Sequence, residues 1–424
     1  MKNLRLPMFL LIALTSWLAA CDNTATNSTD KNVPAAASSN APASTANNDA
    51  GAAAMPKPDY HAIAQKLVTQ CAGVKEGDLV LVTGGAGYLE LLDAVMVEAA
   101  KVGGAPFASY YSDAATKRMD AEVPAKYDAR PDPFWMKALH PNVKVQIALP
   151  AEIDDWSSQV PIERQLARSK ASVTLSEDFS KRNIRMVAVN NGLAPTSANA
   201  KQRGIPPAQL AKLFWDGVNV DYAQLQAKCD AVQATLAAGN EIHITHTNGT
   251  NLKFRTAKQP VFTSDGVISA ADAKRGGLAA TVYLPAGEVY QPIVIGSAEG
   301  KLVIERHLQN GKEIRGLTLT FAAGKLTAMT AASGALNELK ARYDAADANK
   351  AFLSGFDIGT NPSLKISHLD PSGAYVEAGA LTFVVGNNQW LGGKNISNFD
   401  LTSRLHGGTL KVDGKALVEN GGLK

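Results

Sequence analysis

The chain has 424 residues, of which 46% are hydrophobic, and a formal net charge of +3. Lys2 and Arg5 contribute two of these charges, so the rest of the chain is nearly neutral, which argues against a nucleic-acid partner. After the first twenty residues, no apolar run approaches the roughly 18 residues that a membrane-spanning helix requires.

Residues 1–20 have the features of a secretory signal peptide. Lys2 and Arg5 form its positive end, and Leu6 to Trp17 form a short apolar core. The next four residues, Leu18 to Cys21, match a bacterial lipobox, in which the cysteine thiol accepts a diacylglycerol. We therefore predict lipidation at Cys21 and anchoring to a membrane of the bacterial cell envelope, facing outside the cytoplasm. The alternative is an ordinary signal peptide followed by a chance cysteine.

Residues 21–55 are rich in Ala, Ser, Asn, Thr and Pro and contain almost no large apolar side chains. Such a segment cannot bury enough surface to offset the entropy lost on ordering. We interpret it as a flexible tether between the lipid anchor and a folded body of about two domains.

Two cysteines remain after Cys21, namely Cys71 and Cys229, and neither lies in a metal-ligand pattern. Because the cell envelope can be oxidising, a disulfide between them is one alternative. Two buried free thiols are the other, favoured because both cysteines lie in stretches with helical character.

Residues 56–238 alternate between strand and helix signals, which predicts a parallel sheet flanked by helices. The expected strands are 79–83, 107–111, 143–149 and 184–189, and the expected helices are 89–102, 206–214 and 221–238. The first strand, helix and second strand form a β-α-β unit, for which a right-handed crossover is predicted.

Residues 239–424 change to short alternating segments separated by Gly and Asn-Gly turns, which predicts a β-rich domain. The fold class is therefore an α/β domain followed by a β-rich α+β domain. The strands expected here are 241–247, 252–256, 281–284, 301–305, 314–321 and 325–331, with one helix near 334–349.

Two local patterns could be mistaken for binding sites. The glycine turn from Thr83 to Tyr88 resembles a dinucleotide-binding turn, but the chain lacks the Tyr-x-x-x-Lys pair that dehydrogenases of that type use, so a structural turn is favoured. His243 and His246 lie three apart on a predicted strand and so point to opposite faces, which disfavours a shared metal ion.

The segment from Tyr283 to Pro292 is the most informative in the chain. A strand-like run ends in Pro285 and Gly287 and then presents Glu288 between two tyrosines. It resembles the Leu-Pro-x-Gly-Glu-Val segment of the aminopeptidase T-like metallopeptidases, where this glutamate is a ligand of a two-metal centre. Further segments resemble that family in the same order: 74–78, 249–252, 297–300, 316–325, 356–362, 392–395 and 412–414.

At the other ligand positions of that family, the residues differ. Gly355 stands where a glutamate is expected, and Asp357 lies two residues later. Thr382 replaces a histidine, and Asp400 and Thr402 replace a His-x-Asp pair. Glu288 alone is kept, and Asp357 and Asp400 are the predicted additional metal ligands. The tripeptide His368-Leu369-Asp370 is interpreted as a loop, and the alternative is that it supplies metal ligands beside Glu288.

The resemblance implies a metallo-aminopeptidase that removes N-terminal residues from peptides, with Glu288 in a cleft between the domains. It implies zinc or cobalt as cofactor, although the remaining oxygen ligands suit a hard ion better and predict weak or absent binding. Tyr290 is a tentative substrate-binding residue, no catalytic residue is assigned, and a homodimer is implied. The alternative is a non-catalytic protein that binds a peptide or envelope component in the same cleft.

Overall fold

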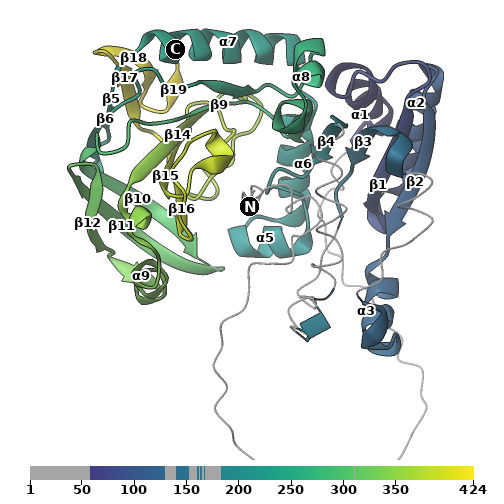
Figure 1. The fold of residues 1–424 in the computed structure, drawn as a ribbon, viewed down its shortest axis with the longest axis horizontal. Helices are drawn as coiled ribbons and strands as arrows, with labels where there is room; N and C mark the ends of the chain where they lie inside the picture. The colour runs from purple at the N-terminus through teal and green to yellow at the C-terminus, as the bar shows by residue number, and fades with distance from the viewer. Residues whose placement is uncertain are drawn as a thin grey trace, which may run out of the picture.

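The computed structural model describes residues 58–128, 140–151, 160–161, 163–164, 167, 183–309 and 311–424. The predicted signal peptide, Cys21 and the tether lie outside the described residues. Within the described part, three sheets are arranged as layers, with the α/β part on one side and the β-rich part on the other (Figure 1). No helix in this part is long and apolar enough to cross a membrane.

The first sheet, sheet A, is parallel and has the strand order β2-β1-β3-β4-β8 in the described residues. Its strands are β1 Leu79–Gly85, β2 Ala105–Tyr111, β3 Val143–Ala148, β4 Arg185–Val189 and β8 Thr281–Leu284. This confirms the predicted parallel sheet. The residues of β1 are almost all buried because helices cover a parallel sheet on its faces.

The helices of this half follow apolar stripes in the sequence. In α7, Leu225, Cys229, Val232 and Leu236 recur at helical spacing and are buried, and Asp221 caps the helix by accepting a hydrogen bond from the Gln224 backbone N–H. The α-helices of the described residues are α1 Tyr60–Lys66, α2 Leu89–Lys101, α3 Asp113–Glu122, α5 Ser197–Arg203, α6 Pro207–Val218, α7 Tyr222–Ala238, α8 Ala270–Arg275 and α9 Leu336–Asp344.

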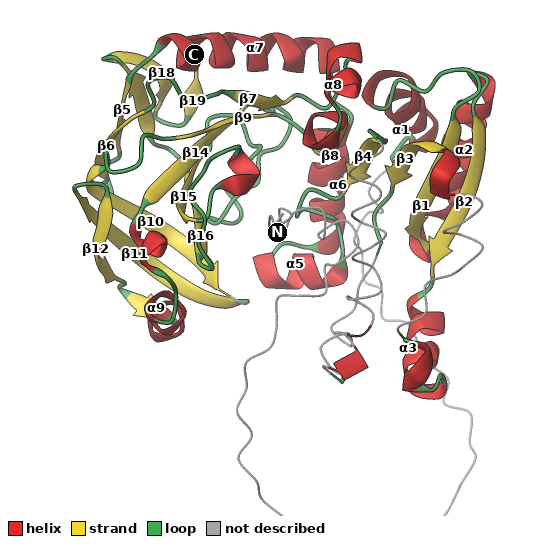
Figure 2. Cartoon of the chain, in the orientation of Figure 1, coloured by secondary structure: helices red, strands yellow, loops and turns green. Residues whose placement is uncertain are grey.

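Two antiparallel sheets form the second half. Sheet B has the order β12-β11-β10-β6-β5-β17-β18-β19, with β13 paired to β11. Its strands are β5 Glu241–Thr245, β6 Asn251–Arg255, β10 Glu299–Gln309, β11 Lys312–Ala322, β12 Lys325–Thr330, β13 Ser333–Gly334, β17 Thr409–Val412, β18 Lys415–Glu419 and β19 Gly422–Leu423. The predicted β-rich character is confirmed, and the strands near the predicted ranges are present (Figure 2).

Sheet C has the order β16-β15-β14-β9-β7. Its strands are β7 Phe262–Ser264, β9 Glu288–Pro292, β14 Leu353–Gly359, β15 Leu381–Gly386 and β16 Asp400–Leu405. Phe356 of β14 packs edge-to-face on Phe254 of sheet B, with ring centroids 5.1 Å apart. Because side chains alternate along a strand, Asp357 lies on the opposite face of sheet C from Phe356.

The boundary expected near residue 238 is not a clean division. Strand β8 follows β5 and β6 in the chain, yet it pairs in parallel with β4 at the edge of sheet A. The buried core is also continuous across both halves. The change of pattern after Gly239 marked the start of the antiparallel strands correctly, but one strand of the parallel sheet comes from beyond it.

Three local patterns have structural roles. A Cβ atom on Gly85 would lie 2.8 Å from the Ala151 Cα atom, so the glycine turn allows β1 to pack against the segment after β3. The Nε2 atom of His243 lies 2.8 Å from Asn251 Oδ1, whereas His246 Nδ1 accepts a hydrogen bond from the Asn248 backbone. Cys71 and Cys229 are buried free thiols, in agreement with the second of the two alternatives.

Candidate functional site

The segment that carries Glu288 links two sheets. Tyr283 and Leu284 end β8 in sheet A, and Glu288 begins β9 in sheet C. The turn between them contains a cis Leu284–Pro285 peptide bond. Glu288 therefore lies where the chain passes from the parallel sheet to the antiparallel one.

Two asparagines hold this turn in place. Asn191 donates a side-chain hydrogen bond to the Pro285 carbonyl at 2.6 Å, and Asn361 donates one to the Ala286 carbonyl at 2.7 Å. Gly287 has φ +120°, and a Cβ atom there would lie 2.8 Å from the Asn361 backbone nitrogen, so only glycine fits. The segment 356–362, which resembles the family in sequence, thus supplies Asn361 to the turn that positions Glu288.

Glu288 and Asp357 form a pair of buried carboxyl groups. Their exposed fractions are 9% and 2%, and the two groups are close enough for each to affect the titration of the other. Burial raises the pKa of Glu288 to about 7. Burial, followed by the charge of Glu288, raises the pKa of Asp357 well above its usual range. The pair therefore resists carrying two negative charges at neutral pH.

A row of side chains extends from this pair across sheet C. In the strand register, Tyr290 lies opposite Asp357, Asp357 opposite Thr382, and Thr382 opposite Arg404. Residues that are directly opposite in adjacent strands share one face of the sheet. The row therefore runs from an aromatic residue through a carboxyl and a hydroxyl group to a guanidinium group.

Three members of this row have polar atoms that lack a hydrogen-bond partner among the residues that the structure describes. These shielded atoms are Asp357 Oδ1, Thr382 Oγ1 and Arg404 Nε. Asp357 is 2% exposed and Thr382 only 1%. Buried polar atoms are nearly always paired in folded proteins, so a contiguous unpaired set suggests a site where a ligand supplies the missing partners.

Arg404 forms the positive end of the row. Its Nη1 atom donates a hydrogen bond to the Ser372 carbonyl at 3.2 Å, and its guanidinium carbon lies 5.4 Å from the centre of the Tyr375 ring. Burial lowers the pKa of Arg404. Tyr375 in turn donates a 3.0 Å hydrogen bond to the Asn191 carbonyl, which connects this end of the site to the α/β half.

Aromatic rings surround the other end of the row. Tyr290 stacks on Phe262 with ring centroids 5.6 Å apart, and the Trp390 ring lies 6.5 Å away on a tilted plane. Burial raises the pKa of Tyr283 to about 12. Tyr290, the predicted substrate-binding residue, lies opposite Asp357 in the strand register. Burial raises the pKa of Tyr290 as well, so Tyr290 keeps its phenolic proton at neutral pH.

The structure does not bring Asp400 to this pair, against the expectation from the sequence. Asp400 lies four residues before Arg404 on β16, which corresponds to about 13 Å along a strand. Its side chain is 42% exposed and forms an ion pair with Arg342. Asp400 therefore belongs to a surface ion pair.

Asp370, the acidic residue of the His368–Asp370 tripeptide, has a structural role. Its carboxylate is fully buried and accepts hydrogen bonds from Arg203 at 2.9 Å, from Arg306, and from the Ser372 hydroxyl. Arg203 ends helix α5, whereas Arg306 lies on β10 of sheet B. The interpretation of this tripeptide as a non-ligand loop agrees with this arrangement.

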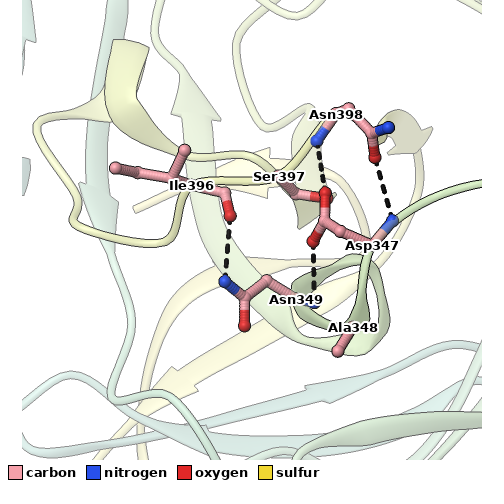
Figure 3. A pocket seen from close by; sticks show the side chains of 6 residues that line it. All are labelled: Asp347, Ala348, Asn349, Ile396, Ser397 and Asn398. Carbon is pink, nitrogen blue, oxygen red and sulfur yellow. Dashed lines mark hydrogen bonds between the residues drawn. The ribbon is translucent and has the colours of Figure 1, made fainter. Parts of the chain in front are cut away.

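A surface hollow of about 560 Å³ lies on another part of the β-rich half (Figure 3). The Asp347 carboxylate accepts hydrogen bonds from the backbone N–H groups of Asn349 and Asn398, at 2.8 Å and 2.6 Å. The Asn349 amide also donates to the Ile396 carbonyl at 3.0 Å. These bonds connect two loops and use the polar groups that a ligand would need, so this hollow is a weaker candidate.

The comparisons with known proteins agree with this architecture. A family model for thermophilic metalloproteases, M29, matches residues 57–363. The chain belongs to this M29 family. A similar solved structure is wild-type AmpT from Thermus thermophilus, with 16% identity, a TM-score of 0.61, and 86% of this chain and 98% of that chain covered.

A second solved structure is 2,5-dihydroxypyridine dioxygenase from Pseudomonas putida KT2440. It has 14% identity and a TM-score of 0.53, and the alignment covers 86% of this chain and 96% of that chain. At these identities both likenesses establish the shared fold. No curated protein sequence matches the chain.

The M29 family is a metallopeptidase family, so a divalent metal is the expected cofactor. The residues of this site do not fit a two-metal centre. In the described part of the chain, no group of three or more His, Cys, Asp and Glu side chains is placed to hold a metal ion. The donor groups near Glu288 include one further carboxyl group and the hydroxyl groups of Ser264 and Thr382, and the guanidinium of Arg404 ends the same row. Zinc and cobalt favour imidazole and thiolate donors over such a set.

Sequence reasoning did not identify Arg404 as part of the site. The signal was present, because Asp400, Thr402 and Arg404 alternate along one strand and therefore share a face. The ligand pattern of the family covers Asp400 and Thr402 and does not extend to Arg404. The orientation of Tyr375 toward Arg404 depends on a loop, for which the sequence carries no periodic signal.

Proposed function

We propose that this M29 protein is anchored to the cell envelope and uses its peptidase site to bind the amino terminus of a peptide. The observation that carries this proposal is the buried Glu288–Asp357 pair, whose oxygen atoms can accept hydrogen bonds from an ammonium group but are too few to hold two transition-metal ions. An ammonium group donates hydrogen bonds and offsets the negative charge that burial disfavours.

The aromatic residues beside the pair support a peptide as ligand. Tyr290 lies opposite Asp357 in the strand register, and the rings of Phe262 and Trp390 lie beside Tyr290, where we place the first side chain of a bound peptide. Aromatic rings offer large apolar contact areas at low entropic cost. The ligand class we infer is therefore a peptide with a free amino terminus and an apolar first residue.

The competing function is metal-dependent removal of N-terminal residues, which membership of the M29 family favours. A direct test measures zinc and cobalt in the purified protein and the hydrolysis of aminoacyl anilides with each ion added. We expect no stoichiometric metal and no hydrolysis above that of a Glu288→Gln variant. Cobalt-stimulated hydrolysis that Glu288→Gln abolishes would show that the protein removes N-terminal residues with the help of a metal ion.

Binding is tested by calorimetry with a pentapeptide that begins with leucine and with its N-acetylated form. We expect the free peptide to bind, and acetylation to weaken binding about tenfold or more because the ionic hydrogen bonds are lost. Equal binding of the two peptides would contradict recognition of the amino terminus.

The membrane anchor is tested separately from the site. The lipobox at Leu18–Cys21 supports lipidation at Cys21. We expect the native protein to fractionate with membranes and the Cys21→Ala variant to be released or to remain an unprocessed precursor. A soluble, unmodified native protein that begins elsewhere would refute this part. The homodimer implied by the family resemblance is tested by light scattering of the mature chain.

A further inference from the structure

Within the described part of the chain, no carboxylate is hydrogen-bonded to the Arg404 guanidinium. Arg404 donates a 3.2 Å hydrogen bond to the Ser372 carbonyl, and its shielded Nε atom has no partner among the described residues. Among the described residues, Asp357 and Asp370 influence it only over longer distances. A shielded guanidinium group is costly unless an anion compensates it.

Thr382 separates this cation from the carboxyl pair. The register places Thr382 between Asp357 and Arg404 on the same face of sheet C, and its hydroxyl group is unpaired and 1% exposed. The row therefore offers acceptors at one end, a hydroxyl in the middle and donors at the other end. This order is complementary to a molecule with an ammonium group at one end and a carboxylate at the other.

We propose that Arg404 binds the terminal carboxylate of a short zwitterionic peptide whose ammonium group is held by Glu288 and Asp357. This inference rests on the proposed function and specifies its substrate class. Two strand spacings of about 4.8 Å separate the backbones of Asp357 and Arg404. An extended peptide spans about 3.5 Å per residue, so two or three residues fit between the charged ends.

The experiment uses the mature full-length protein and calorimetry with four ligands: Leu-Ala, its C-terminal amide, its N-acetylated form and a leucine-initiated pentapeptide. We expect Leu-Ala to bind best, and amidation to weaken binding about tenfold or more because the bond to a charged guanidinium is lost. The Arg404→Gln variant should bind Leu-Ala and its amide equally.

The matched control is Arg342→Gln. Arg342 lies on α9 and forms a surface ion pair with Asp400, which lies on β16, the strand that carries Arg404. This variant should keep the preference for the free carboxylate. If Arg404→Gln does not fold, the four ligands on the native protein still test the proposal, and Arg404→Lys should retain part of the preference because it retains the charge.

The outcomes separate the two proposals. If acetylation weakens binding but amidation does not, the inference about Arg404 is overturned and recognition of the amino terminus stands. If the pentapeptide binds as tightly as Leu-Ala, the length limit is overturned. If no ligand with a free amino terminus binds, the proposed function itself fails, and the inference fails with it.

Discussion

Two buried acidic clusters in the β-rich half differ in how their charge is balanced. Asp370 accepts hydrogen bonds from Arg203, Arg306 and Ser372, and its pKa is lowered. Glu288 and Asp357 have each other as neighbours, and the pKa of both is raised. A carboxylate with all its partners in the chain stabilises the fold, whereas a carboxyl pair with an unpaired oxygen is available for a ligand.

The largest effect is expected from breaking the balanced cluster. Asp370→Ala should lower the free energy of unfolding by about 3–5 kcal/mol, because it leaves two arginines without their buried partner. Denaturant titration measures the change. The control Asp400→Ala removes an exposed ion pair and should cost about 0–1 kcal/mol. Equal losses in the two variants would contradict the structural role of Asp370.

The pH dependence of stability should differ between the clusters. Because the pKa of Glu288 is about 7 in the folded state and 4.5 ordinarily, its unfolded form loses the proton first as the pH rises. Its contribution to stability is therefore full below pH 4.5 and is lost as the pH rises to about 7. The lowered pKa of Asp370 has the opposite sign: its contribution is full above pH 3.8 and is lost in more acidic solution.

The measurement compares native protein with Glu288→Gln between pH 4.5 and 7. The difference reports on the Glu288–Asp357 pair, because His307 and His406, whose pKa values burial lowers to about 4, titrate in both proteins. As the pH rises from 4.5 to 7, the free energy of unfolding of the variant should increase relative to that of the native protein by about 1 kcal/mol or more. A difference that does not change with pH would contradict the raised pKa.

The smallest effect on stability is expected from Asp357→Asn. This change keeps the shape of the side chain and removes the repulsion between the two carboxyl groups, so the free energy of unfolding should stay within about 1 kcal/mol of the native value. Thermal and denaturant unfolding measure it. A loss as large as that of Asp370→Ala would show that Asp357 is fully paired in the folded chain.

The fold class and the position of Glu288 could be predicted from the residues alone. Period-two and helical patterns are local, so β1, α2, α7 and β11 could be predicted from their own residues. The motif from Tyr283 to Glu288 was recognisable because its proline, glycine and glutamate are fixed by one short turn. Lipidation at Cys21 likewise depends on neighbouring residues, and it stays a prediction.

The surroundings of Glu288 depend on contacts between distant parts of the chain. Strand β8 joins the sheet of the first half, although the antiparallel pattern begins some forty residues before it. Asp357, Thr382 and Arg404 come from three strands, and their alignment depends on strand register. The sequence could not distinguish the buried Asp357 from the exposed Asp400, because the partners of both residues come from distant parts of the chain. Burial and charge balance arise from those long-range contacts, and they separate a binding group from a surface ion pair.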